Sequence, residues 1–309
     1  MINLYKLFVP LCIRRFIRSL FCVIKYFPQH ISYCINKANN KNEFENNLAI
    51  MAIIKNEGPY LKEWIEYHCI VGVEKFIIYD NESNDNTMEI LQPYIDNNIV
   101  HYTWFPGYKM QYKATNHAIK KWRNRIKYIA MIDADEFIVP VQNDTIMDVI
   151  NDAESTAKLN KKRFIGLVIK WVNYGFCGHY SKPAGLITEN YKKSDGISKC
   201  HKTIINPQMV MHYQVHDGTY LLNDFGIDEN GEEVTGFVEP SKATVNKIRI
   251  NHYWTKSYEE FKIKHSRGDA IYGKSNYNVP DYDPEYLSHN EDYIMIKYID
   301  RLKAVMNLS

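Results

Sequence analysis

The sequence predicts an α/β protein built on a largely parallel sheet, and three observations support this fold class. Between residues 48 and 132, four short apolar runs alternate with segments that have helical spacing. Three of these runs end in clusters of polar residues. Hydrophobic residues make up 45% of a 309-residue chain, which is enough for a large core and excludes a disordered chain, a collagen-like chain and a simple coiled coil.

The elements of this sheet follow from the pattern. The segments between the apolar runs have apolar residues three and four positions apart, as on one face of a helix. Gly72 stands where the first helix is expected to end, because glycine is common at that position. The apolar runs are predicted as strands over 48–54, 75–79, 99–104 and 127–132, and helices are predicted over 60–71, 87–94 and 114–125.

Residues 1–35 form a basic amphipathic segment. Residues 1–30 hold five basic residues and no acidic one. Charges interrupt the apolar runs, so neither a membrane-spanning helix nor a signal peptide is predicted. Two roles stay open: the helix lies on an anionic bilayer, or it packs its apolar face on the domain. That face consists of Ile13, Phe16, Ile17, Leu20, Phe21 and Ile24.

The rest of the chain divides into three parts. Residues 36–47 are polar and aperiodic, and are predicted as a linker. The main domain is predicted over 48–275. A helical tail follows over 276–309, and its apolar residues are expected either to pack on the domain or to form a dimer contact.

Charge and cysteine content narrow the function classes. The 38 Lys and Arg residues nearly balance the 36 Asp and Glu residues, so no nucleic-acid partner is expected. None of the six cysteines forms a CxxC pair, which indicates isolated reduced thiols rather than a zinc site or a disulfide scaffold. We therefore expect a cytoplasmic protein.

The polar clusters predict a ligand site. They occupy 55–57, 80–86 and 133–136, and ligands of open α/β sheets bind beyond the carboxyl ends of strands. Asp133 and Asp135 are two positions apart, and such side chains of an extended chain point to the same side. Two carboxylates placed in this way can hold a divalent cation that also binds a diphosphate. A solvated acidic turn is the alternative, although the apolar residues around the motif favour a ligand role.

Three blocks together resemble nucleotide-sugar glycosyltransferases of the GT-A fold, whose sheet is Rossmann-like and mostly parallel. They are AIIKNE at 52–57, YDNESNDN at 79–86 and MIDADEF at 131–137. The closer similarity is to glycosyltransferase family 92 and the related bacterial family-2-like enzymes. It extends through NHYWTKS at 251–257 to about residue 270.

The resemblance implies a donor site for a nucleotide sugar and a bound Mn²⁺ or Mg²⁺. The implied metal ligands are Asp133, Asp135 and His252. The implied donor-binding residues are Lys55, Asn56, Glu57, Asp80, Asn81, Ser83, Asp85, Lys113, Asp133 and Ala134.

Each of these roles has a structural alternative. Residues 80–86 can instead be a polar turn that caps the helix at Thr87. His252 can be a buried histidine bonded to backbone, and Lys113 can lie on a solvated helix face. An inverting transfer also needs a general base for the acceptor hydroxyl. Its candidates are Asp217 first, then His216 and Glu239.

The predicted function is a metal-dependent transfer of a hexose from a nucleotide diphosphate sugar, with UDP-sugar as the expected donor, to a glycan hydroxyl with inversion. The expected setting is surface polysaccharide or lipopolysaccharide synthesis at the inner face of the cytoplasmic membrane. Two alternatives stay open. One is a metal-dependent nucleotidyltransferase or sugar-nucleotide hydrolase, and the other is a catalytically silent binding protein of the same fold.

Overall fold

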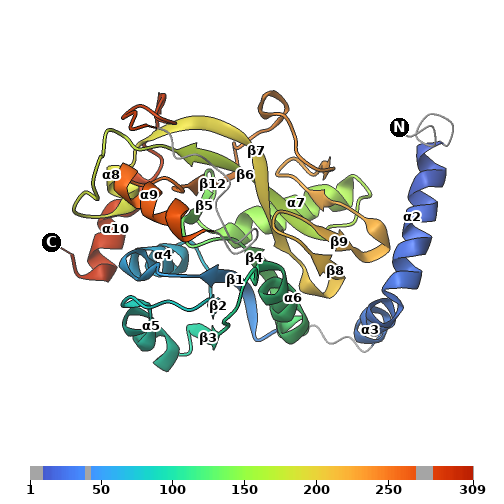
Figure 1. Cartoon of the computed structure of the whole chain (residues 1–309). Coiled ribbons are helices and arrows are strands. Elements are labelled where there is room, and N and C mark those ends of the chain that lie inside the picture. The colour runs from blue at the N-terminus through green and yellow to red at the C-terminus, as the bar shows by residue number, and fades with distance from the viewer. Residues whose placement is uncertain (1–9, 39–42, 269–280, 309) are drawn as a thin grey trace.

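The central sheet is formed by the strands that the apolar runs predict. The structure, a computed structural model, describes residues 10–38, 43–268 and 281–308. Four parallel strands stand in the order β4-β1-β2-β3 (Figure 1). They are β1 (Asn46–Ile54), β2 (Lys75–Asp80), β3 (Val100–Trp104) and β4 (Ile126–Met131). The predicted strands are thus confirmed to within a few residues.

The central stretches of β1 and β2 are apolar because both faces of the sheet are covered there. Along β1, Leu48 and Ile50 belong to one core cluster, whereas Ala49 and Met51 belong to the cluster on the opposite face. The three predicted helices are confirmed, and each connects two of these strands. They are α4 (Gly58–Ile70), α5 (Thr87–Asp96) and α6 (Gln111–Trp122).

Antiparallel strands extend the parallel sheet beyond β4. The long strand β7 (Lys193–Ile205) pairs antiparallel with β4 and with β6 (Gly166–Tyr174). In turn, β12 (Ile248–His252) runs parallel to β6 and antiparallel to β5 (Glu136–Pro140). Short strands complete the sheet: β10 (Gly226–Ile227), β11 (Glu233–Val234) and β13 (Asn290–Glu291).

Further elements surround this sheet. A two-stranded sheet consists of β8 (Val210–Tyr213) and β9 (Gly218–Tyr220). The remaining helices of the domain are α7 (Ile146–Leu159), α8 (Ile187–Asn190), α9 (Tyr258–Arg267) and the short turns η1 (Pro207–Met209), η2 (Leu221–Asn223) and η3 (Pro240–Lys242).

Two glycines explain where α4 begins and ends. A Cβ on Gly58 would lie 2.3 Å from Asn86 Oδ1, so only glycine lets the start of α4 approach the start of α5 this closely. Asp85 joins the two helix starts, because it accepts hydrogen bonds of 3.0 Å from Gly58 N and from Thr87 N. Gly72 has φ of +96°, which confirms the predicted helix end.

The predicted linker is shorter in the structure, and a helix follows the predicted domain as the sequence analysis expected. The N-terminal helices are α2 (Leu11–Lys25) and α3 (Phe27–Ala38), so helix continues into the segment predicted as linker, and β1 begins at Asn46. Residues 39–42 lie outside the described ranges. At the C-terminal end, α10 (Ile296–Met306) packs against α4. Across the described ranges, no helix is both long and apolar enough to span a bilayer.

Candidate functional site

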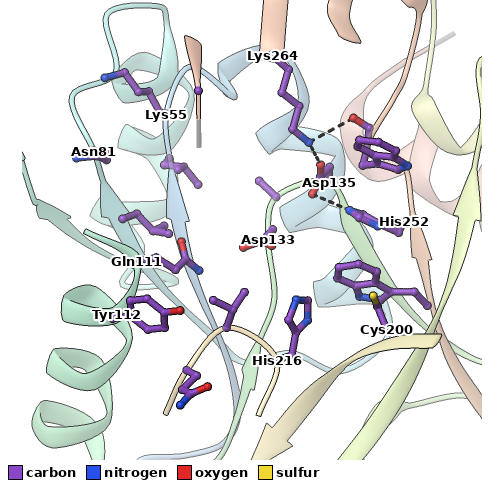
Figure 2. Close-up of a pocket in the computed structure, with 18 of the residues that line it drawn as sticks. Lys55, Asn81, Gln111, Tyr112, Asp133, Asp135, Cys200, His216, His252 and Lys264 are labelled. Carbon is purple, nitrogen blue, oxygen red and sulfur yellow. Dashed lines mark hydrogen bonds and ion pairs between the residues drawn. The ribbon is translucent and has the colours of Figure 1, made fainter. Parts of the chain in front are cut away.

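A cavity of about 1020 Å³ lies at the carboxyl ends of the parallel strands. Figure 2 shows side chains converging on it from both halves of the sheet. Its walls come from the end of β1, the loops after β2, β3 and β4, the strands β6, β7 and β12, and helix α9. Ligand pockets measure about 300–1,000 Å³, so the space suffices for a nucleotide sugar.

The structure brings most of the implied site residues into this cavity, but not all of them. Those in its lining are Lys55, Glu57, Asn81, Asp133, Ala134, Asp135, His216, Asp217 and His252. Those outside its lining are Asn56, Asp80, Ser83, Asp85, Lys113 and Glu239.

Several residues outside the lining shape the loops that form it. Asp80 is buried, and its two carboxylate oxygens accept hydrogen bonds from Ser83 N at 2.8 Å and Tyr102 OH at 3.0 Å. Asn56 N donates to Ser83 Oγ at 2.9 Å, and Asn56 Oδ1 accepts from Asn84 N at 2.8 Å. These side chains hold the loops after β1 and β2 together, so their contacts are those of a structured polar turn.

Two other predicted residues point elsewhere, whereas Asn81 forms part of the wall. Lys113 is exposed on α6, and Glu239 is exposed immediately before η3. The Asn81 amide donates to Phe105 O at 3.1 Å and to Gly107 O at 2.9 Å. It thereby fixes the loop after β3 against the loop after β2.

The two aspartates of the acidic motif point in different directions. The sequence analysis expected an extended segment, but Glu136 N donates to Asp133 O at 3.1 Å and closes a turn. Asp133 accepts a hydrogen bond of 2.7 Å from Lys202. Asp135 is buried and forms an ion pair with Lys264, as Figure 2 shows. The turn therefore separates the carboxylates that an extended chain would have placed side by side.

Strand register places His252 beside this acidic turn. His252 lies opposite Glu136 of β5 and opposite Asn173 of β6. Its Nδ1 is 3.2 Å from Asn173 Oδ1, so the proton resides on Nδ1 and the Nε2 lone pair faces Asp135 Oδ1 at 3.8 Å. Burial lowers the pKa of His252 to about 4, although the charge of Asp135 opposes this shift. The imidazole is therefore neutral at pH 7.

A divalent cation fits the residues around His252. Asp135, Glu136 and His252 offer ligand atoms that lie within 4.8 Å of one another. Glu136 Oε1 is buried and has no hydrogen-bond partner among the described residues, which is costly unless a ligand binds there. Burial raises the pKa of Glu136 well above its usual range, and the charge of Lys202 opposes this shift. Carboxylate oxygens with one neutral imidazole are suitable ligands for Mn²⁺.

Lysines surround the acidic turn. Burial alone would raise the pKa of Asp135, but the nearby charge of Lys264 brings it below its usual value. Lys202 has a side chain that is 2% exposed and lies 3.6 Å from Glu136. Lys256 pairs with Glu57 at 3.1 Å on another side of the cavity. Each of these ammonium groups is paired with a carboxylate, and of the three only Lys264 is in the cavity lining, where it can meet a phosphate group.

Two proton acceptors line the side of the cavity near β8 and β9. Asp217 Oδ1 accepts from Tyr220 OH at 2.6 Å and from Gly218 N at 2.7 Å. Burial raises the pKa of Asp217 despite these hydrogen bonds. His216 Nδ1 donates to His201 O at 2.9 Å, which leaves Nε2 as the acceptor atom. Burial lowers the pKa of His216, so its imidazole is also neutral.

Two aromatic rings of the cavity wall lie beside its histidines. The Trp171 ring centroid is 4.2 Å from that of His252 and 5.2 Å from that of His216. Phe237 is 59% exposed, with centroid distances of 5.8 Å to His216 and 5.9 Å to His201. Both ring nitrogens of buried His201 lack a hydrogen-bond partner among the described residues. The cavity thus has aromatic rings in its wall, beside a histidine whose polar atoms are buried and unpaired among the described residues.

The sequence analysis missed Glu136 as a metal-site residue, and it missed Lys202 and Phe237. Glu136 stands inside the acidic motif, and its position directly before the apolar run at 137–139 is the sequence signal that could have drawn attention to it. Lys202 lies 66 positions after Glu136 in the chain, and only the β4–β7 pairing brings its strand beside the acidic turn.

Comparison with known proteins identifies the family. The sequence profile of glycosyltransferase family 92 matches residues 53–283. A glycosyltransferase family 92 protein of Ricinus communis is 28% identical over 247 residues, which are 75% of this chain and 40% of that protein. The β-1,4-galactosyltransferase galt-1 of Caenorhabditis elegans is 22% identical over 249 residues, which are 74% of this chain and 53% of that protein. The chain thus spans about half the length, or less, of these relatives.

Solved structures give a more distant likeness. Residues 1–349 of S. aureus TarS, in complex with UDP-GlcNAc, are 14% identical with a TM-score of 0.39. The match covers 70% of this chain and 63% of that one. The family profile, in contrast, spans most of the chain, and we conclude that the protein belongs to glycosyltransferase family 92.

Proposed function

We propose that the protein is a metal-dependent hexosyltransferase that uses a UDP-sugar as donor and a glycan hydroxyl as acceptor. The observation that carries this proposal is the buried group of Asp135, Glu136 and His252, which opens into a cavity large enough for a nucleotide sugar. Membership of family 92 supports the reaction class. The name of the C. elegans relative, a galactosyltransferase, supports a hexose as the transferred sugar.

In this proposal the donor diphosphate lies beside the acidic turn. Asp135, Glu136 and His252 would hold Mn²⁺ or Mg²⁺, which when bound would neutralise charge on the diphosphate as a Lewis acid. Lys264 is placed to bind a phosphate oxygen once it leaves Asp135. Tyr108 is 68% exposed at the cavity wall and offers a flat face to the nucleotide base.

The transfer itself is a direct displacement with inversion. The acceptor oxygen forms a bond to the anomeric carbon while the bond from that carbon to the diphosphate oxygen breaks. The hydroxyl proton passes to Asp217, whose raised pKa suits a general base, or to His216 Nε2. The bonding electron pair leaves with the diphosphate.

The acceptor glycan is proposed to bind over Trp171, His216 and Phe237. Pockets of this type combine apolar ring faces with a few polar atoms that fix orientation. The setting that we propose is surface polysaccharide or lipopolysaccharide synthesis at the inner face of the cytoplasmic membrane, in line with the sequence analysis.

A donor screen with matched variants tests the proposal. The purified full chain is incubated with UDP-galactose, UDP-glucose or UDP-GlcNAc, with and without oligosaccharide acceptors, and UDP release is measured. We expect release that needs both acceptor and Mn²⁺ and is lost in Asp135→Asn and Asp217→Asn. The control Lys120→Met, at an exposed position of α6, should keep full activity.

Other outcomes would contradict the proposal. Equal UDP release with and without acceptor would identify a sugar-nucleotide hydrolase. Pyrophosphate formation from UTP and a sugar phosphate would identify a nucleotidyltransferase. No release with any donor, together with no UDP binding, would identify a catalytically silent binding protein.

A further inference from the structure

The helices α2 and α3 carry a row of exposed apolar side chains, called here the outer apolar surface. Its members recur three and four positions apart, so they follow one side of each helix. Single exposed apolar residues are ordinary, but a continuous set is typical of an interaction surface. On α2 they are Ile13, Phe16, Leu20, Phe21 and Ile24, and on α3 they are Phe27, Ile31 and Ile35, with exposed fractions between 44% and 69%.

The opposite side of α2 attaches the helix to the domain. Ser19 donates to Leu222 O at 2.6 Å, and the Cys22 thiol donates to Tyr220 O at 3.4 Å. Arg15 forms an ion pair on the same side. At 3.6 residues per turn, Ser19 and Cys22 lie roughly opposite the outer apolar surface. Figure 1 shows α2 at the edge of the domain, with no described element on its outer side.

Five of the six residues of the predicted apolar face are exposed, so the structure does not support packing of this face on the described part of the domain. The residues that pack α2 on the domain are Cys22 and its neighbours in a small cluster with Met211 and Leu221. The predicted apolar face is not in that cluster. The face is therefore available to a partner outside the described part of the chain.

The charge around the outer apolar surface indicates the partner. Residues 10–38 include no acidic residue. Arg18 and Lys25 are exposed, and on the helix they follow one edge of the apolar row. A bilayer with anionic headgroups satisfies both features, since apolar side chains enter the acyl region and basic ones meet the headgroups. A second copy of the chain fits less well, because two such surfaces would bring only positive charges together.

We propose that α2 and α3 bind peripherally to a bilayer that contains anionic lipids, with the outer apolar surface inserted and with Arg18 and Lys25 at the headgroups. The site where α2 attaches to the domain is connected to the catalytic cavity by a short stretch of chain. The helix α2 packs on η2, which directly follows β9, and the turn that connects β8 to β9 lines the cavity. Membrane binding would thus hold this wall of the cavity near the lipid surface.

Sedimentation with lipid vesicles tests the proposal on the full chain. Vesicles contain phosphatidylcholine alone or with about 30 mol% phosphatidylglycerol. The double variant Phe16→Ser/Phe21→Ser should lower the partition coefficient by about a hundredfold, because two inserted rings are lost. The matched control Leu159→Ser removes an apolar side chain that is 82% exposed at the end of α7 and should bind like the wild type. Arg18→Gln and Lys25→Gln should each lower binding by about fivefold.

Three results would overturn the inference. The first is a wild-type chain that binds neither kind of vesicle, and the second is a double phenylalanine variant that binds as the wild type does. The third is a wild-type dimer, seen by light scattering, that the double variant converts to monomer without any vesicle binding. UDP binding by the same variants checks their fold, so a failure of this inference is distinguishable from a failure of the proposed donor site.

Discussion

Replacing Asn173 by leucine tests whether His252 is a metal ligand held in one tautomer. Asn173 Oδ1 is the acceptor for His252 Nδ1 at 3.2 Å, a neutral hydrogen bond of about 1 kcal/mol. Without it, the imidazole can move its proton to Nε2, the atom that faces Asp135. Partners behind metal-binding histidines contribute about 10–100-fold to metal affinity. Because this hydrogen bond is neutral, we expect Asn173→Leu to weaken Mn²⁺ binding by the lower end of this range, about tenfold or about 1.4 kcal/mol.

The assay is a titration of Mn²⁺ in the presence of UDP, with free Mn²⁺ followed by electron paramagnetic resonance. Asn173→Asp is the matched control, because it keeps an acceptor oxygen at the same position and should preserve or increase the affinity. Thermal unfolding monitors the fold of both variants. An Asn173→Leu variant that is folded and binds Mn²⁺ as tightly as the wild type would refute the assignment of His252.

Three further perturbations follow from the buried charges and histidines. Lys264→Met removes the ammonium that pairs with Asp135, so Mn²⁺ binding without nucleotide should tighten by about fivefold; calorimetry that shows weaker or equal binding would contradict this competition. Lys202→Met should cost about 3 kcal/mol in urea unfolding, because two carboxylates lose their buried partner, and a change below about 1 kcal/mol would count against that pairing. His68 has a pKa lowered to about 3 by burial, so the unfolded chain binds more protons between pH 6.5 and 3 and stability falls as the pH drops through this range. His68→Gln should lower the slope of the free energy of unfolding against pH by up to roughly 1.4 kcal/mol per pH unit in this range. An unchanged slope, measured by urea unfolding at several pH values, would contradict this role.

The sequence predicted the parallel strands well because burial on both faces requires a run of apolar residues. A strand covered on both faces is apolar where it is covered, as residues 48–54 of β1 and 76–79 of β2 are. The polar loops that follow such strands must then meet at one edge of the sheet. This reasoning correctly placed Lys55, Asn81 and Asp135 in one cavity.

The details of the site depended on features that one sequence does not carry. The turn at Asp133 to Glu136 separates the two aspartates, and a spacing of two residues is compatible with either a turn or a strand. The partners of His252 depend on the register of β12 against two strands far away in the chain. Lys202 occupies a strand position that alternation alone does not distinguish from its neighbours.

The surroundings of the N-terminal helix were also not predictable from the sequence. Its apolar periodicity correctly predicted α2, but the pattern is the same for a face buried on a domain and for a face exposed to a bilayer. The contacts of Arg15, Ser19 and Cys22 reveal that the opposite side holds the helix to the domain.

Calorimetric titration of UDP, with Mn²⁺ or with a chelator, tests the central claim most directly. We predict that UDP binds the wild type in the presence of Mn²⁺ and binds at least about tenfold more weakly with the chelator or in Asp135→Asn, because the buried ligand group joins the diphosphate through the cation. UDP binding of equal affinity in all three conditions would contradict a metal-dependent donor site. The absence of UDP binding by the wild type with Mn²⁺ would contradict the UDP-sugar donor itself.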